Sequence, residues 1–94
     1  MLYELTIITP EETTEMGIEQ LERVIRQYAT EISKKEDDGI KRLAYSIMGH
    51  DRGHFLYYEI DLTQGKPQEL SSRLNINDTV LRYLLVKADT RVKR

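Results

Sequence analysis

The sequence predicts an α+β domain in which four strands form an antiparallel sheet and two helices cover one of its faces. Three observations support this prediction: segments with helical apolar spacing, segments with alternating spacing, and the order in which they occur. That order is strand, helix, strand, strand, helix, strand, which is typical of ferredoxin-like folds. Crossover connections in such folds place both helices on one side of the sheet.

The first strand and helix are predicted from residues 2–32. The segment LYELTIIT, residues 2–9, alternates as a strand does, and Pro10 ends it. Thr13 or Thr14 then supplies a helix N-cap. The helix itself is predicted from apolar residues that recur every three or four positions: Ile18, Leu21, Val24, Ile25, Tyr28, Ala29 and Ile32.

Two further strands are predicted to form a hairpin. The polar stretch SKKEDDG, residues 33–39, begins an extended segment that becomes IKRLAYSIM, residues 40–48. The next strand is HFLYYEIDL, residues 54–62, and GHDRG, residues 49–53, is expected to be the turn between them.

A second helix and a last strand complete the domain. Pro67 suits the first turn of a short helix, in which Leu70 and Leu74 form an apolar stripe. The strand follows within NDTVLRYLLVKA, residues 77–88. We expect one domain over residues 1–88 and a short basic tail over residues 89–94.

Alternation of side chains along each strand predicts which residues face the helices and which face solvent. Tyr45 and Tyr58 are expected in the core. The helix-facing set is Tyr3, Leu5, Ile7, Leu43, Tyr45, Ile47, Leu56, Tyr58, Ile60, Tyr83 and Leu85. The opposite, open face would present Leu2, Ile8, Ala44, Phe55, Tyr57, Leu84 and Val86. Because a contiguous uncovered apolar patch typically marks a partner surface, we expect a protein to bind there, on Leu2, Phe55, Tyr57, Leu84 and Val86.

Charge is distributed unevenly along a chain whose formal net charge is −2. Residues 1–40 carry four Lys or Arg against ten Asp or Glu, whereas residues 82–94 carry five cations against Asp89 alone. This asymmetry favours one cationic patch over positive charge spread across the whole surface. The chain has no cysteine, which excludes disulfides and thiolate metal sites. No apolar run approaches the roughly 20 residues that span a bilayer, so no membrane partner is expected.

No catalytic constellation is evident, and we expect no enzyme, no cofactor and no small-molecule substrate. His50 and His54 flank Asp51, but this spacing across a hairpin offers no third fixed metal ligand, and solvated histidines are favoured. Gly49 and Gly53 lie in the expected hairpin, not between a strand and a helix, so they do not form a phosphate loop.

One alternative is a freestanding module that binds single-stranded RNA, like an RNA-recognition motif. The octamer RGHFLYYE, residues 52–59, faintly resembles the aromatic motif of that family. However, His54 and Leu56 occupy the stacking positions and are predicted to face the helices. Phe55 and Tyr57 would remain open to bases.

Over nearly its whole length the chain resembles the small-subunit ribosomal protein six family of bacterial type. The resemblance depends on Tyr3-Glu4, on Lys41-Arg42-Leu43-Ala44-Tyr45 with Ile47 after Gly39, on Phe55 to Tyr58 after Gly53, and on Asn77-Asp78 before Val80, Arg82 and Lys87. It implies a structural protein of the small ribosomal subunit, in the cytoplasm or an organelle. It also implies binding to small-subunit rRNA as a heterodimer with small-subunit ribosomal protein eighteen.

The candidate rRNA contacts are basic residues near the hairpin and the C-terminus: Lys41, Arg42, Arg82, Lys87, Arg91, Lys93 and Arg94. For the first two, a charged strand edge that discourages unwanted pairing is an equal alternative. Alternation places Arg42 on the open face with Ala44, and Lys41 at the rim of the helix-facing side.

Overall fold

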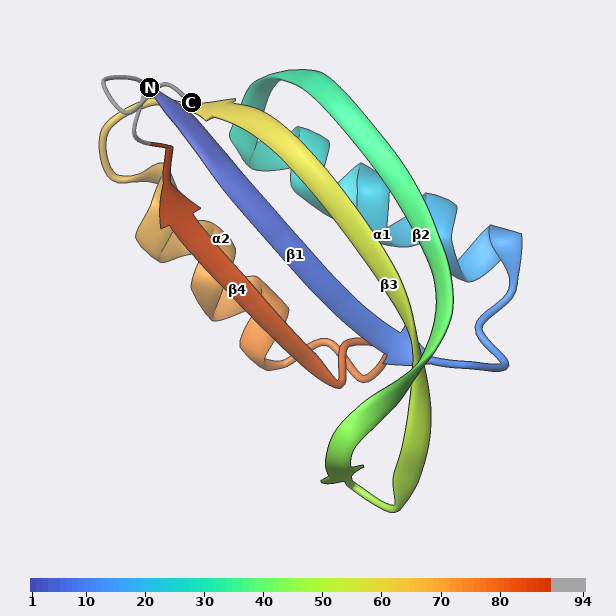
Figure 1. The fold of residues 1–94 in the computed structure, drawn as a ribbon. Coiled ribbons are helices and arrows are strands. Elements are labelled where there is room, and N and C mark those ends of the chain that lie inside the picture. The colour runs from blue at the N-terminus through green and yellow to red at the C-terminus, as the bar shows by residue number, and fades with distance from the viewer. Residues whose placement is uncertain (89–94) are drawn as a thin grey trace.

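The computed structural model describes residues 1–88, so the predicted tail with Arg91, Lys93 and Arg94 lies outside the described residues. The elements are β1 (Leu2–Pro10), α1 (Glu15–Tyr28), β2 (Ala29–Ile47), β3 (His50–Leu62), α2 (Lys66–Asn75) and β4 (Arg82–Lys87). The strands form one antiparallel sheet in the order β2-β3-β1-β4. Both helices cover the same face (Figure 1), which confirms the predicted ferredoxin-like fold. Among residues 1–88, no helix is long and apolar enough to cross a membrane.

The core lies between the helices and one face of the sheet. Every side chain in it is at most 3% exposed: Leu5, Ile7, Leu21, Ile25, Leu56, Tyr58, Ile60, Leu62, Leu70 and Leu74. Burial of each such side chain stabilises the fold by about 1.5–3 kcal/mol. The placement of Tyr58 in the core is therefore confirmed. Tyr3, Tyr83 and Leu85 pack against this core and remain partly exposed.

Helix α1 begins where its sequence predicts and ends earlier than expected. The Thr14 hydroxyl caps it by accepting a hydrogen bond of 3.2 Å from the Gly17 N–H. The prediction that Ala29 and Ile32 continue the helix is wrong, because the backbone becomes extended at Ala29 and enters β2. Ile32 pairs with Ile60 of β3, and it packs against the core from the sheet.

The hairpin turn contains two residues, not the five expected. Met48 and Gly49 have φ values of 49° and 83°, and Ile47 pairs with His50 directly behind them. Two consecutive residues with positive φ form the tight turn that matches the twist of paired strands. His50, Asp51 and Arg52 therefore belong to β3, which makes the hairpin longer than predicted.

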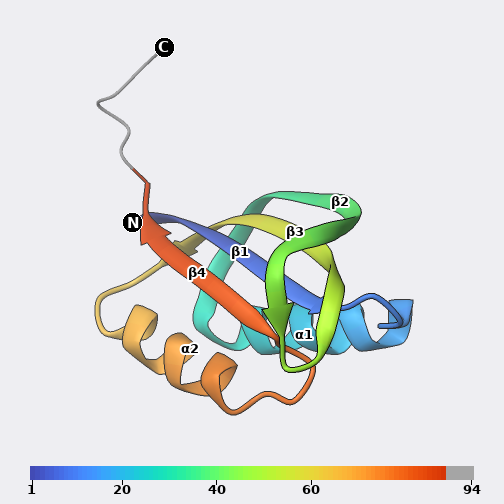
Figure 2. The same cartoon turned by 60° about the horizontal axis from the view of Figure 1, so that its bottom comes forward.

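Strand β2 carries more residues than the part of β3 that it pairs with, so its register shifts repeatedly. The shifts lie between Ala29 and Glu31, Ile32 and Lys34, Asp37 and Gly39, and Arg42 and Ile47. Bulges of this kind bend a strand and increase its twist. Figure 2 accordingly shows the β2–β3 hairpin curving back across the open face toward the start of β4.

The bulge between Asp37 and Gly39 overturns the predicted facing of several β2 residues that follow it. Lys41 pairs with Gly53, so it shares the open face with Phe55, whereas Arg42 pairs with Arg52 and faces the other way. Leu43 is also on the open face, where a Cβ built on Gly53 would lie 3.6 Å from Leu43 Cδ2 and 2.5 Å from Ile8 Cγ2.

The hairpin also projects past the helices (Figure 1), which affects burial on it. Within residues 1–88, no helix reaches this part of the hairpin to cover Leu43 and Tyr45, which were both predicted to face one. Leu43 is nevertheless buried, next to Gly53 of β3, whereas Tyr45 is 64% exposed, so the assignment of Tyr45 to the core is wrong.

Candidate nucleic-acid and protein interface

The open face is organised as rows of residues that run across β3, β1 and β4. In one row Phe55 pairs with Ile8, which pairs with Arg82. In the next row Tyr57 and Leu84 flank Thr6. The sheet therefore brings together residues that lie far apart in the sequence, on the side opposite the helices.

All members of the predicted protein-binding patch lie on this face. A third row joins Glu59, Glu4 and Val86, and Leu2 lies in the last row, opposite Asp61. Leu84 is 61% exposed and Val86 is 40% exposed. Phe55 and Tyr57 are half-buried, although neither belongs to the core under the helices. An apolar stripe thus runs along β4 with no described element over it.

One end of the open face is cationic and aromatic. The Nζ atom of Lys41 lies 5.5 Å from the centroid of the Phe55 ring. The Arg82 guanidinium lies 5.8 Å from the Tyr45 ring centroid, and its Nη1 donates a hydrogen bond of 3.4 Å to the Tyr45 hydroxyl. Cation–π contacts hold a cation in place without neutralising it. Both charges therefore remain available to an anion.

The other end is acidic, which the sequence reasoning missed. Glu4 and Glu59 are directly opposite each other, and Glu36 pairs with Tyr57. The Tyr57 hydroxyl donates a hydrogen bond of 2.9 Å to Glu59 Oε2. Burial, together with this bond and the surrounding carboxylates, raises the pKa of Tyr57 well above its ordinary value. Alternation had already placed Glu59 beside Tyr57, so the signal was present in the strand pattern.

The predicted rRNA contacts do not form one cluster. Lys41 and Arg82 lie on the open face near the hairpin, and Arg42 lies on the hairpin's opposite face. Lys87 pairs with Tyr3 at the far end of β4, on the side of the sheet that the helices cover. The structure therefore places Lys41 and Arg82 on the same face near the hairpin and separates Lys87 from both.

Comparison with known proteins identifies the family. The profile for the family described as "Ribosomal protein S6" matches residues 2–87. The chain belongs to this family. The small ribosomal subunit protein bS6 of Rickettsia prowazekii is 32% identical over 73 residues, which are 78% of this chain and 60% of that protein. The bS6 protein of Thermus thermophilus is 33% identical over 70 residues, which are 74% of this chain and 69% of that protein.

A solved S6 structure shares the fold. The crystal structure of 30S ribosomal protein S6 from Thermotoga maritima has a TM-score of 0.80 with this chain. The match covers 93% of this chain and 86% of that one, at 23% identity. The bacterial S6 family and the ferredoxin-like architecture therefore agree with the resemblance in the sequence.

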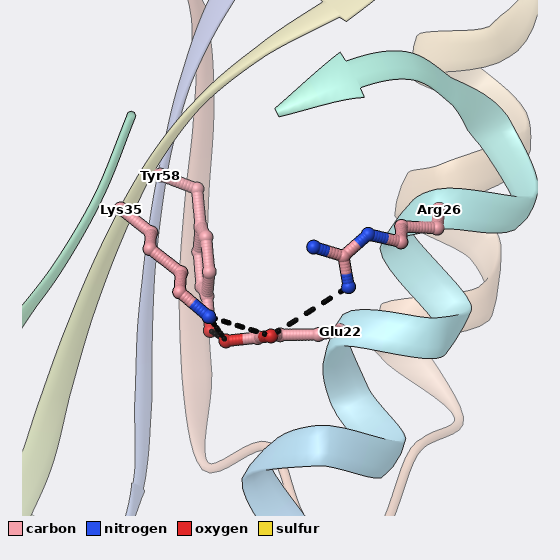
Figure 3. A network of polar contacts seen from close by, with 4 residues as sticks. All are labelled: Glu22, Arg26, Lys35 and Tyr58. Atoms are coloured by element: carbon pink, nitrogen blue, oxygen red, sulfur yellow. Dashed lines mark hydrogen bonds and ion pairs between the residues drawn. The ribbon is translucent and has the colours of Figure 1, made fainter. Parts of the chain in front are cut away.

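In this S6-family chain a polar network ties α1 to the sheet (Figure 3). The Glu22 carboxylate accepts hydrogen bonds from Lys35 Nζ at 3.1 and 3.3 Å and from the Tyr58 hydroxyl at 3.0 Å. Arg26 Nη1 lies 3.8 Å from the same carboxylate, whose side chain is 11% exposed. Burial, followed by the charge of Glu22, raises the pKa of Tyr58. Because its groups satisfy one another, the network has a structural role.

The two histidines of this S6-family chain both lie in β3. His54 Nε2 lies 2.6 Å from Asp37 Oδ1, and this hydrogen bond lowers the pKa of Asp37. The same Asp37 oxygen accepts the Gly39 N–H at 2.9 Å, so it braces the bulge in β2. The side chain of His54 is only 14% exposed, and Leu56 is buried in the core. Neither base-stacking position of an RNA-recognition motif is therefore open.

Proposed function

We propose that this chain is a structural component of the small ribosomal subunit. In this proposal it binds small-subunit rRNA together with small-subunit ribosomal protein eighteen, in the cytoplasm or in an organelle. Membership of the S6 family supports the assignment to the small subunit. The observation that carries the interface is the uncovered apolar stripe along β4, which extends from the cationic end of the open face to the row of Glu4 and Glu59.

The two ends of this face suit different ligands. Lys41 and Arg82 carry charges that their aromatic neighbours leave unneutralised, which suits phosphate groups of rRNA. Leu84 and Val86 suit the apolar surface of the protein partner. The carboxylates of Glu4 and Glu59 then complement basic residues of that partner.

Few phosphate contacts are available to the chain alone, so its affinity for rRNA should be weak and should fall steeply with salt. The protein partner adds its own contacts and covers the apolar stripe. Binding by the pair should therefore be much tighter than binding by either protein alone.

The test is an rRNA-binding titration with this chain, with the partner, and with both. Leu84→Glu should abolish the gain that the partner gives, because it places a charge in the stripe. Ile76→Glu is the matched control, since Ile76 is 75% exposed and lies directly after α2, away from the open face. Tight rRNA binding by this chain alone, unaffected by the partner or by Leu84→Glu, would refute the proposal.

A further inference from the structure

The hairpin places two arginines directly opposite each other. Arg42 of β2 and Arg52 of β3 are register partners, the last regular pair before the irregular end of the hairpin. Both are exposed. Side chains opposite each other in an antiparallel pair share one face, with Cβ atoms about 4.5–5.5 Å apart. The two guanidinium groups therefore project from the same patch of the hairpin.

No carboxylate compensates this pair within the described residues. The ion pairs of residues 1–88 involve neither Arg42 nor Arg52. Asp51 is the nearest acid in sequence, but alternation points it to the other face of β3, where its Oδ1 accepts a hydrogen bond of 2.6 Å from the Ser46 hydroxyl. Like charges directly opposite each other destabilise a strand pair. An anion placed between the two groups would relieve that repulsion.

We propose that Arg42 and Arg52 together form a binding site for one backbone phosphate of RNA. Guanidinium groups bind phosphate oxygens through paired, charge-assisted hydrogen bonds. Two guanidinium groups on one patch can therefore bind the same phosphate group. The site lies on the face of the hairpin opposite Lys41, so it is separate from the cationic end of the open face. This site rests on the proposed function, because rRNA is the polyanion of the small ribosomal subunit. It fixes position and reads no base.

Arg52 was not among the rRNA contacts predicted from the sequence, because only the register of the hairpin shows that it lies opposite Arg42. The competing explanation is that both arginines merely keep the strand edge from pairing with other chains. The two explanations predict different results. A phosphate clamp sacrifices stability for binding, so its removal should weaken RNA binding without destabilising the fold.

The experiment compares Arg42→Gln, Arg52→Gln and the double variant with the unmodified chain. Arg23→Gln is the control, because Arg23 is an exposed arginine on α1. Binding of a small-subunit rRNA fragment is measured with the protein partner present, across salt concentrations of about 50–200 mM. Thermal unfolding is measured for every variant.

We expect each hairpin variant to bind several-fold more weakly, with Tm unchanged or slightly raised. The slope of log affinity against log salt should become shallower by about 0.7–0.9 for each phosphate that the variant no longer binds. The double variant should bind only slightly more weakly than either single variant, because one phosphate is shared. The control should match the unmodified chain.

Unchanged affinity and slope in the hairpin variants, with normal binding by the unmodified chain, would overturn this site and leave the proposed function standing. Aggregation of these variants at normal RNA affinity would likewise overturn it in favour of edge protection. A weaker affinity that only follows a lower Tm would also overturn it. If the unmodified pair itself failed to bind the rRNA, the proposed function would fall, and this site with it.

Discussion

Lys41 lies over the ring of Phe55, so a cation from β2 covers an aromatic side chain of β3 on the open face. The contact explains how an apolar ring remains half-buried with no helix above it. It also holds the ammonium group on the open face, where Arg82 belongs to the same row of the sheet as Phe55. A charged residue near the strand edge thus becomes part of the open face of the sheet.

Lys41→Gln should weaken joint binding of rRNA several-fold and reduce the free energy of unfolding by only about 0.5–1 kcal/mol, the size of an exposed cation–π contact. Lys34→Gln is the matched control, because the Lys34 ammonium group forms an ion pair with the Glu36 carboxylate at the acidic end of the open face. An rRNA titration and chemical denaturation measure the two effects. An equal decrease of rRNA affinity in both variants would contradict the division of the open face.

Glu22→Ala should destabilise the fold by about 1–3 kcal/mol, because it leaves the buried Tyr58 hydroxyl without its acceptor. Glu19→Ala, on the exposed side of the same helix, should change stability by less than about 0.5 kcal/mol. Combining Glu22→Ala with Tyr58→Phe should be less destabilising than the sum of the two single changes. Strict additivity in urea denaturation would show that the two groups are not coupled.

Alkaline pH should destabilise the protein through Tyr58. Its folded-state pKa is raised above the ordinary value of 10.0, chiefly by burial, so the unfolded chain releases this proton first. The stability that Tyr58 contributes is therefore fully present below about pH 10 and is lost as the pH rises further. Tyr58→Phe should make the decline above pH 10 shallower by up to about 1.4 kcal/mol per pH unit. Denaturation at several alkaline pH values measures this slope, and identical slopes would contradict the prediction.

Acid should weaken the brace at the β2 bulge. The hydrogen bond from His54 lowers the pKa of Asp37 below its ordinary value of 3.8, so its contribution is present above that pH and is lost as the pH falls through the folded-state pKa. Because Asp37 is largely exposed, the effect should be at most about 1 kcal/mol. Asp37→Asn should reduce the acid dependence below about pH 4 relative to the unmodified chain. Acid titrations of this variant and the unmodified chain that coincide would contradict this role.

Gly53→Ala should destabilise the protein by about 1–3 kcal/mol, because the new methyl group would meet Ile8 Cγ2 at 2.5 Å. The change tests how closely the base of the hairpin packs on β1. Ile8→Ala removes the clashing atom, so Gly53→Ala should be much less harmful in that background. A full penalty in both backgrounds, measured by denaturation, would place the conflict elsewhere.

The fold was predictable because local patterns and element order agree. Alternation in residues 2–9 and 54–62 and the helical spacing around Leu21 and Leu70 each describe an element that buries one side. The four-strand topology follows from their order and from the handedness of the crossovers. The end of α1 was misplaced because Ala29 and Ile32 fit both spacings, and pairing with β3 decides in favour of a strand.

The candidate site was predictable only where strands are regular. Leu84, Val86, Phe55 and Tyr57 lie on unbroken alternation, and their common face is as expected. The facing of the residues after Gly39 could not be predicted, because a bulge adds a residue to β2 without any clear mark in the sequence. Two features depend on that shift and on the two-residue turn. One is the contact of the Tyr45 ring with Arg82, and the other is the pairing of Arg42 with Arg52.

The repeated bulges of β2 have a consequence for aligning relatives of this protein. A bulge is a place where chain length can change by one residue while the ladder on either side persists. Because residues paired across the ladder share a face, the residues beyond the bulge keep their facing when the extra residue is absent. A relative with a one-residue gap near Asp38 should therefore alternate without a break from the position of Glu36 into the stretch that here reads IKRLAY. Alignments that omit this gap would equate a residue on the open face with one on the opposite face.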